Sequence, residues 1–384
     1  VGGAEAGVSA EGPRDCVEFP RFVMKALTFY HEVLNTVEYR GEYAQEDPAC
    51  ALLHAEAMRQ LSLALPPGSI AMLVRLIVTR LLPLAADDLY LWEHDPEALI
   101  RSDLNGWQER VRPCAEILLS TLARRFPQIS VPVIIELSNE LHQLCAGISW
   151  DQAPLDTVLF KDAVYNAMSL AGEDLVRCVN LHELFGERFT EDLHVMDSHH
   201  RIIRRRIACL IEAWFCLGAL ELPTTLADVV MRSLCFLARP EEDVSVRLSA
   251  AVAIRNVVLQ GSIDSERFMP YFEDVVRSLT SLVAIVREGF IHIQILDVIT
   301  ALVKHLKPIS RTLADSLLES LNGLWVQGHK GDGLLKSNIL RCLRQIVRCT
   351  VDNVPCALAV LPAVVQSSKL DAPDGIHLLE DSLS

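Results

Sequence analysis

The chain has 384 residues, of which 51% are hydrophobic and only 6% aromatic. A single globular core does not grow comfortably to this length, and a composition rich in small aliphatic residues favours helix-on-helix packing over a β-sandwich. The formal net charge of −15 disfavours nucleic-acid binding, because phosphate contacts require positive charge. Eleven cysteines without short paired spacings do not resemble a disulfide framework or a zinc site.

The acidic excess lies entirely in the first half of the chain. Residues 1–200 contain 30 acidic and 15 basic residues, whereas residues 201–384 contain 20 of each. The excess either serves solubility alone or forms an acidic face that attracts basic partners. The most apolar predicted helix, at 70–84, is interrupted by Arg75 and Arg80. A membrane span needs about 20 apolar residues, so we expect a soluble intracellular protein without membrane insertion.

Apolar residues at helical spacing predict most elements of the first half. Residues 1–19 show no periodicity and are expected to form a disordered lead-in. Residues 87–105 form an acidic and aromatic insertion, which Pro96 breaks and which is too irregular for one continuous helix. The helix from 131 to 145 is expected to carry Pro132 at its start. The other helices are predicted over residues 20–39, 48–65, 69–86, 106–125, 154–178, 181–196 and 198–217.

The stretch from 222 to 260 shows how the rest of the chain is organised. It reads as two helices that are separated by an acidic turn. The second helix has too many apolar positions for a surface helix with one buried face, so it needs neighbours on two sides. Helix pairs of about 40 residues that cannot bury themselves alone indicate a solenoid. Further helices are predicted over 268–286, 287–306, 314–326, 334–350 and 355–366, followed by a frayed tail at 369–384.

The same stretch resembles a HEAT repeat. The family pattern has a proline early in the first helix and an aspartate in the turn, followed by Val-Arg and alanine in the second helix. Pro223, Asp243, Val246-Arg247 and Ala250 match that pattern. The resemblance implies that Asp243 and Arg247 belong to a structural ladder that repeats from unit to unit. We therefore predict an all-α HEAT-repeat solenoid of about nine helical hairpins over residues 20–368.

Motifs of enzymes are missing from the sequence. It has no GxSxG, GxGxxG, P-loop or HExxH pattern, and the segment that starts at His182-Glu183 lacks the second histidine. His199 and His200 are adjacent, which is the wrong spacing for two metal ligands on one helix face. We therefore expect no catalytic activity, no cofactor and no metal.

Four segments in order resemble large nuclear transport receptors of the importin-β superfamily, and in particular its importin-11 branch. The first is Leu-Trp-Glu-His-Asp-Pro-Glu at 91–97, which is similar to the Trp-Glu-x-Asp-Pro-Glu signature of the superfamily. The others resemble the branch: Arg-Pro-Cys-Ala-Glu at 112–116, Asp-Ala-Val-Tyr-Asn-Ala at 162–167 and the arginine-rich helix at 204–214.

The resemblance implies the central segment of a transport receptor. Such a receptor binds protein cargo, contacts the Phe-Gly repeats of nucleoporins, and is regulated by the Ran GTPase in its GTP form. It shuttles between nucleus and cytoplasm, and we expect it to be a monomer with basic cargo. Two alternatives remain: a generic HEAT-repeat scaffold of another complex, or an exportin of the same superfamily.

Two groups of residues are candidates for partner binding. The acidic insertion either binds cargo or is a structural insertion that covers a junction between repeats. The basic start of the helix at 198–217 either contacts an acidic partner or pairs with neighbouring carboxylates along the solenoid. The candidate residues are Asp87, Asp88, Trp92, Glu93, Asp95 and Glu97 in the insertion, and Arg201, Arg204, Arg205 and Arg206 in the helix.

Overall fold

The structure is a computed structural model that describes most of the chain. The described residues are 18–36, 48–105, 109–145, 147–148, 150, 153–216, 224–259, 265–306, 308–327 and 333–350, with residues 355, 358, 361, 362 and 365. The predicted lead-in up to residue 17, Pro223 and the predicted tail at 369–384 lie outside these ranges, as does most of the predicted helix at 355–366.

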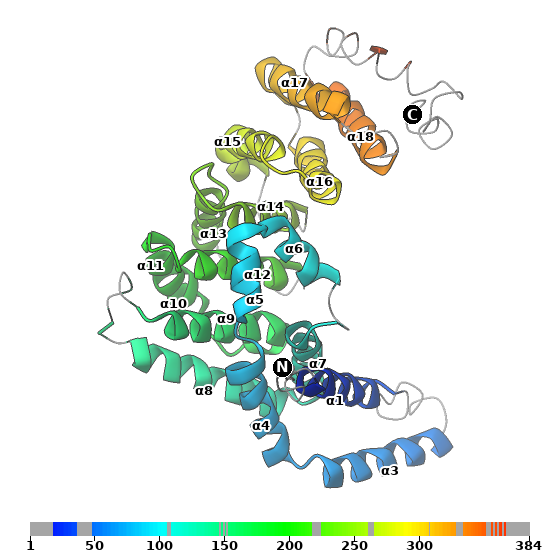
Figure 1. The fold of residues 1–384 in the computed structure, drawn as a ribbon, viewed down its shortest axis with the longest axis vertical. Helices are drawn as coiled ribbons and strands as arrows, with labels where there is room; N and C mark the ends of the chain where they lie inside the picture. The colour runs from blue at the N-terminus through cyan, green and yellow to red at the C-terminus, as the bar shows by residue number, and fades with distance from the viewer. Residues whose placement is uncertain are drawn as a thin grey trace, which may run out of the picture.

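The described helices form a curved stack of antiparallel pairs, which confirms the predicted all-α solenoid (Figure 1). One helix of each pair lies on the convex side, at the left of Figure 1, and the other on the concave side. Four outer helices are single elements: α8 (Pro127–Cys145), α13 (Thr224–Leu237), α15 (Ser265–Val283) and α17 (Arg311–Gln327). The first outer helix is α4 (Pro67–Leu76), which continues as the π-helix η2 (Ile77–Leu81). One further outer position is filled by three consecutive short elements, α10 (Leu181–Glu183), the π-helix η4 (Leu184–Arg188) and α11 (Phe189–His194). Their inner partners are α7 (Val111–Arg125), α9 (Leu155–Val176), α12 (Arg201–Cys216), α14 (Val244–Leu259), α16 (Gly289–His305) and α18 (Gly333–Cys349).

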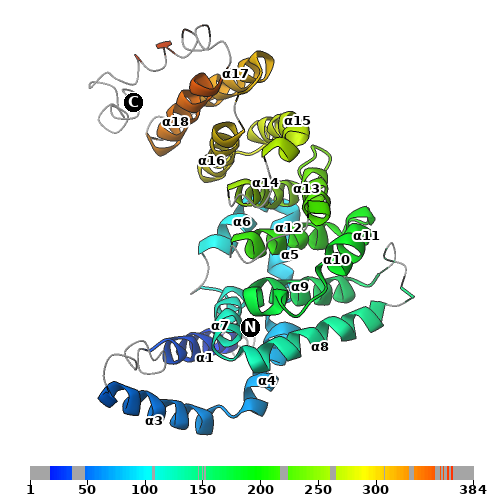
Figure 2. The same ribbon diagram turned by 180° about the vertical axis from the view of Figure 1, so that it is seen from behind.

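The inner helices form a continuous row in which each one packs on the next. Helix α1 (Glu18–Leu34) packs on α7, and the row then runs through α9, α12, α14 and α16 to α18. An inner helix therefore has neighbours on both sides and needs apolar residues on two faces. Helix α14 has this pattern, with ten of its residues buried. The same view from behind shows the row on the opposite side of the molecule (Figure 2).

Several predicted boundaries differ from the structure. The helix predicted to start at Val131 begins at Pro127, so Pro132 lies inside α8. The helix predicted from Phe268 begins at Ser265, which places Pro270 inside α15. Both prolines are exposed on the outer surface, where water can satisfy the carbonyl that loses its N–H donor. The helix predicted to reach residue 86 ends with η2 at Leu81, shortly before Pro83.

Six helix pairs lie in the described ranges, fewer than the nine expected from chain length. The difference arises because α1 and α3 (Pro48–Ala64) precede the pairs, and the acidic insertion adds length without adding a pair. The insertion consists of two short helices, α5 (Ala86–His94) and α6 (Pro96–Asn105), between the two members of the α4/α7 pair. Of the described helices, none is by itself long and apolar enough to span a membrane, and α3 with α4–η2 passes such a test only as a pair bent by 63°.

Candidate functional site

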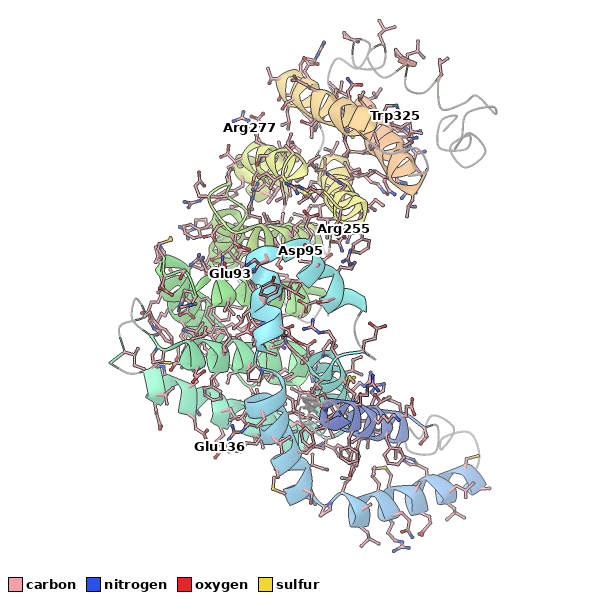
Figure 3. All side chains as sticks on the ribbon, in the orientation of Figure 1. Glu93, Asp95, Glu136, Arg255, Arg277 and Trp325 are labelled. Carbon is pink, nitrogen blue, oxygen red and sulfur yellow. The ribbon has the colours of Figure 1, made fainter. Side chains whose placement is uncertain are left out.

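The acidic insertion lies across the stack and not within it. We call residues 86–105, which comprise α5 and α6, the acidic strap. Figure 1 shows the strap, coloured cyan, running along the long axis of the molecule in front of α12 and towards α14. It follows the edge at which the inner helices α12, α14 and α16 begin. Figure 3 labels Glu93 and Asp95 at the end of α5 on this edge.

The first half of the strap is anchored by two buried side chains. Asp88, which is 2% exposed, accepts a hydrogen bond from the backbone N–H of Ala85 (2.9 Å) and forms an ion pair with Arg110. Trp92 is 3% exposed, and the guanidinium groups of Arg201 and Arg205 lie 5.8 Å and 5.4 Å from its ring centre. Burial of the indole and the two cation–π contacts hold α5 against α12.

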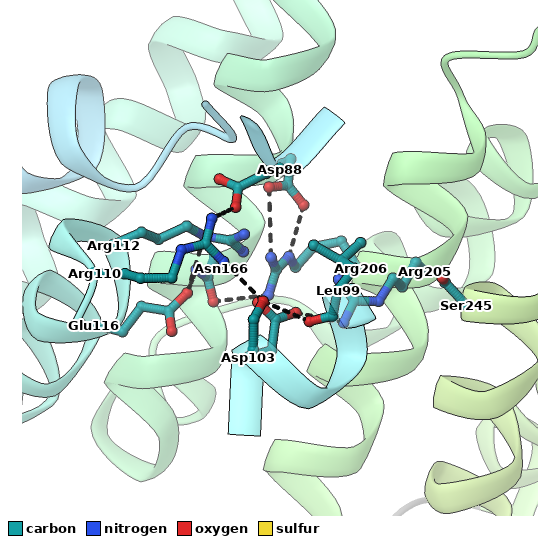
Figure 4. Close-up of polar contacts among 12 residues, drawn as sticks. Asp88, Leu99, Asp103, Arg110, Arg112, Glu116, Asn166, Arg205, Arg206 and Ser245 are labelled. Atoms are coloured by element: carbon teal, nitrogen blue, oxygen red, sulfur yellow. Dashed lines mark hydrogen bonds and ion pairs between the residues drawn. The ribbon is translucent and has the colours of Figure 1, made fainter. Parts of the chain in front are cut away.

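The arginines of α12 are paired with carboxylates from neighbouring elements (Figure 4). Arg205 binds Asp103 of the strap at 2.7 Å, and Arg206 binds Asp162 of α9 at 2.7 Å. Burial by itself would raise the pKa of Asp103, but Arg205 and then Arg112 outweigh it, so this pKa is lowered. The other two arginines are paired as well: Arg204 binds Glu242 at 3.0 Å, and Arg201 forms ion pairs with Glu93 and with Asp243.

Asp243 and Arg247 connect α14 to the units on either side of it. Asp243 accepts a hydrogen bond from the backbone N–H of Ser245 (2.9 Å), so it caps the helix, and it also pairs with Arg201 of the preceding unit (3.4 Å). Arg247 is 2% exposed and donates to the backbone carbonyl of Ser278 in the following unit (2.7 Å). The geometry thus gives both residues structural contacts between units.

The predicted partner-binding residues separate into two groups. Asp88, Trp92, Arg204, Arg205 and Arg206 are buried by the contacts described above, so we withdraw them from the partner-binding surface. The physical reason is that each arginine pairs with a carboxylate within the solenoid. The remaining residues, of which Asp87, Glu93 and Asp95 are exposed and Glu97 and Arg201 are partly exposed, stay candidates.

The sequence interpretation missed the carboxylates that pair with these arginines, namely Asp103, Asp162 and Glu242. Asp162 lies in one of the family-like segments, and Glu242 stands next to Asp243 in the turn before α14. No local pattern links these carboxylates to the arginines, because Asp103, Asp162 and Glu242 lie 102, 44 and 38 residues away from their partners in the sequence. Among the residues that the structure describes, no group of three or more His, Cys, Asp or Glu side chains could hold a metal ion.

A groove lies on the convex side of the described part of the molecule. It has a volume of about 890 Å³ and lies between α11, α13 and α15. Apolar side chains line it, including Leu193, Val229, Phe236, Tyr271 and Val275. Three arginines stand around these side chains: Arg232, Arg239 and Arg277. A second groove of about 170 Å³ lies between α8 and η4, so open spaces recur between successive outer helices. No sequence feature located these grooves.

Comparisons with known proteins give a consistent result. No protein-family model matches the chain. Human importin-11 is 25% identical over 370 residues, which is 96% of this chain and 37% of importin-11. The importin beta-like protein KAP120 of Saccharomyces cerevisiae is 24% identical over 339 residues, or 84% of this chain and 31% of that protein.

A solved structure has the same fold. The S. cerevisiae protein Lph2, described as a bidirectional nuclear transport receptor, matches with a TM-score of 0.78 and 21% sequence identity over 94% of this chain and 35% of Lph2. The chain thus spans about a third of the length of these relatives, which are transport receptors and not enzymes. Relatives of the importin-β type match nearly the whole chain, well beyond the four ordered segments, which supports its placement among the nuclear transport receptors of that family.

Proposed function

We propose that this chain is a segment of an importin-type receptor that binds protein cargo and Phe-Gly repeats of nucleoporins in a transport cycle regulated by Ran-GTP. The observation that carries the proposal is the groove between α11, α13 and α15. It is open, apolar and placed on the convex side, so a side chain of an extended partner can enter it without any movement of the inner helices. The relatives named above give the family context for this use of the groove.

The groove suits a weak and reversible aromatic contact. Burying one phenylalanine side chain contributes about 1.5–3 kcal/mol, whereas even a millimolar dissociation constant requires about 4 kcal/mol. A single inserted phenylalanine would therefore bind weakly, and several grooves acting together would be needed for useful affinity. The second groove between α8 and η4 supplies one further site of the same kind. Weak single sites allow rapid exchange, as passage through a pore requires.

Cargo binding is assigned to the exposed part of the acidic strap. Glu93 and Asp95 lie at the C-terminal end of α5 on an edge of the solenoid, Asp87 lies in its first turn, and Tyr90, which is 62% exposed, lies between Asp87 and Glu93 in sequence. Carboxylates beside an exposed aromatic ring are suited to a basic segment, because charge attraction and cation–π contacts act together. The proposed function of the whole receptor, including regulation by Ran-GTP, is inferred from sequence similarity to the relatives named above.

The proposal is tested by retention of the purified chain on immobilised Phe-Gly repeats. The variant Val229→Asp places a charge in the apolar groove and should weaken retention at least tenfold, as expected from losing the burial of one phenylalanine. The matched control is Met269→Asp, because Met269 is an exposed apolar residue of α15 that does not line this groove. Equal retention of both variants and the parent chain would contradict the assignment of the groove.

Two further measurements in the same experiment distinguish an importin from an exportin, and a transport receptor from a generic scaffold. Added Ran-GTP should release bound cargo from an importin, whereas an exportin would hold its cargo more tightly. The exportin alternative is kept because Lph2 is described as a bidirectional receptor. Failure of the parent chain to bind Phe-Gly repeats, cargo and Ran-GTP at low salt would favour the generic scaffold.

A further inference from the structure

The acidic strap breaks the rule that units of a solenoid contact only their neighbours. It emerges from the α4/α7 pair, yet it touches the start of α16, and three helix pairs lie between these two places in the stack. The carboxylate of Glu97 accepts hydrogen bonds from the backbone N–H groups of Arg287 (3.0 Å) and Glu288 (2.7 Å), about 190 residues later. Arg101 of the strap also pairs with the Glu288 side chain at 2.5 Å.

The negative charge of the strap is complementary to the helix ends beside which it lies. It carries six carboxylates against the single Arg101, and it passes the N-terminal ends of α12, α14 and α16. Such ends present unpaired backbone N–H groups and a partial positive charge. Helix α16 shows the match most clearly, because its own N-cap residue, Glu288, makes no side-chain capping hydrogen bond. Glu97 supplies the negative charge at this end from outside the helix.

The contacts that hold the strap differ in how accessible they are to water. The α5 end is held by buried Asp88 and Trp92, so it is expected to remain attached in the folded protein. Helix α6 itself is held by buried Leu99 and Ile100 and by the ion pair of Asp103 with Arg205. Its contacts with α16 are reached by water, since the side chains of Arg101 and Glu288 are 50% and 29% exposed. Exposed ion pairs contribute little individually and are screened by salt. The contact between α6 and α16 is therefore the one that can open while the rest of the strap stays attached.

We propose that the acidic strap is a latch that fixes the curvature of the solenoid from α7 to α16, and that it opens at the contact between α6 and α16. While the latch is closed, one rigid connection spans the four successive junctions between pairs from α7 to α16 and limits their flexing. When it opens, the strap still contacts α12 and α14, but the junction between α14 and α16 flexes independently and the segment extends. The proposal concerns the mechanics of this chain and holds whether or not the groove binds Phe-Gly repeats.

The test compares the parent chain with the double variant Glu97→Ala/Arg101→Ala. Hydrogen exchange of the Arg287 and Glu288 amides should become about tenfold faster, as expected when a charged acceptor is lost. In small-angle X-ray scattering, the radius of gyration of the parent chain should rise between 50 mM and 1 M NaCl, because the Debye length falls to about 3 Å at 1 M salt. The variant should already be expanded at 50 mM and change less with salt.

Two further variants make the test decisive. The matched control is Arg311→Ala/Asp315→Ala, which removes an exposed ion pair of 2.9 Å that lies entirely within α17. Glu97→Gln keeps an acceptor oxygen and nearly the same shape, so it should fold normally and give a smaller increase in exchange. Unchanged exchange at Arg287 and Glu288 in both Glu97 variants would overturn the proposal. The same expansion in the α17 control would also overturn it.

Discussion

The ion pair between Arg206 and Asp162 gives the sharpest prediction about stability. Both side chains are buried, the guanidinium Nε lies 2.7 Å from a carboxylate oxygen, and Arg206 also donates to Asn166 at 2.8 Å. Burial alone would lower the pKa of Arg206, but the charge of Asp162 reverses this effect and raises it above the ordinary value. Asp162→Asn keeps the shape but leaves a buried guanidinium without its counter-charge, which should cost about 3–5 kcal/mol.

Removing both charges should cost less than removing one. In the double variant Asp162→Leu/Arg206→Met no buried charge is left unpaired, so the main penalty is the lost hydrogen bond at Asn166, about 1–3 kcal/mol. Asn166 still donates to Glu116 at 2.7 Å in either variant. The comparison therefore separates the cost of an unpaired charge from the cost of altered packing.

Urea unfolding measures the difference. With a slope of about 3 kcal/mol per molar urea, a loss of 3 kcal/mol lowers the midpoint by about 1 M. Because long repeat arrays can unfold in parts, hydrogen exchange in α9 and α12 should identify the unit that responds. A midpoint shift well below 0.5 M for Asp162→Asn, or a double variant less stable than the single one, would refute the argument.

Three further outcomes are expected. Burial, opposed by Arg205 and Arg255, raises the pKa of Glu212 above its usual value, so its charge destabilises the folded state at neutral pH. Glu212→Gln should therefore raise the urea midpoint at pH 7, and the gain should vanish as the pH falls towards 4.5. Burial raises the pKa of the Cys235 thiol to about 12, so this thiol should react with maleimide about 10²-fold or more slowly than an ordinary thiol, as mass spectrometry can measure. Arg247→Met removes the hydrogen bonds from this guanidinium to the Ser278 carbonyl and the Ser281 hydroxyl and should cost about 1–3 kcal/mol in the same urea assay, less than Asp162→Asn.

The architecture could be predicted from local sequence because a solenoid is built from local units. The apolar residues on two faces of α14 require neighbours on both sides, and the structure supplies α12 and α16 there. The turn residue Asp243 caps α14 as its type and position indicate. Boundaries were less accurate where a proline stands on an exposed helix surface, as Pro132 and Pro270 do, because water replaces the missing hydrogen-bond partner.

The contacts of the candidate site could not be predicted in the same way. Arg204, Arg205 and Arg206 form a run that is typical of an exposed basic patch, and only distant carboxylates such as Asp103 and Asp162 make their burial possible. The contact of Glu97 with α16 depends on the curvature of three intervening pairs, which no local pattern encodes.

The groove depends on the spacing between helices for the same reason. Val229 is an ordinary position on the predicted apolar stripe of α13, and it lines the groove together with Phe236 only because α11 and α15 are separated from each other at this point. The apolar pattern of one helix does not encode the distance between its neighbours.

The burial of three consecutive arginines on α12 has a practical consequence for handling the protein. In the folded chain their charges are neutralised by carboxylates of the same chain, so polyanions should bind weakly to this helix. Local unfolding uncovers the whole run at once, in a chain that is otherwise strongly acidic. Retention on heparin would then report damaged molecules in a preparation, and the flow-through would contain the intact ones.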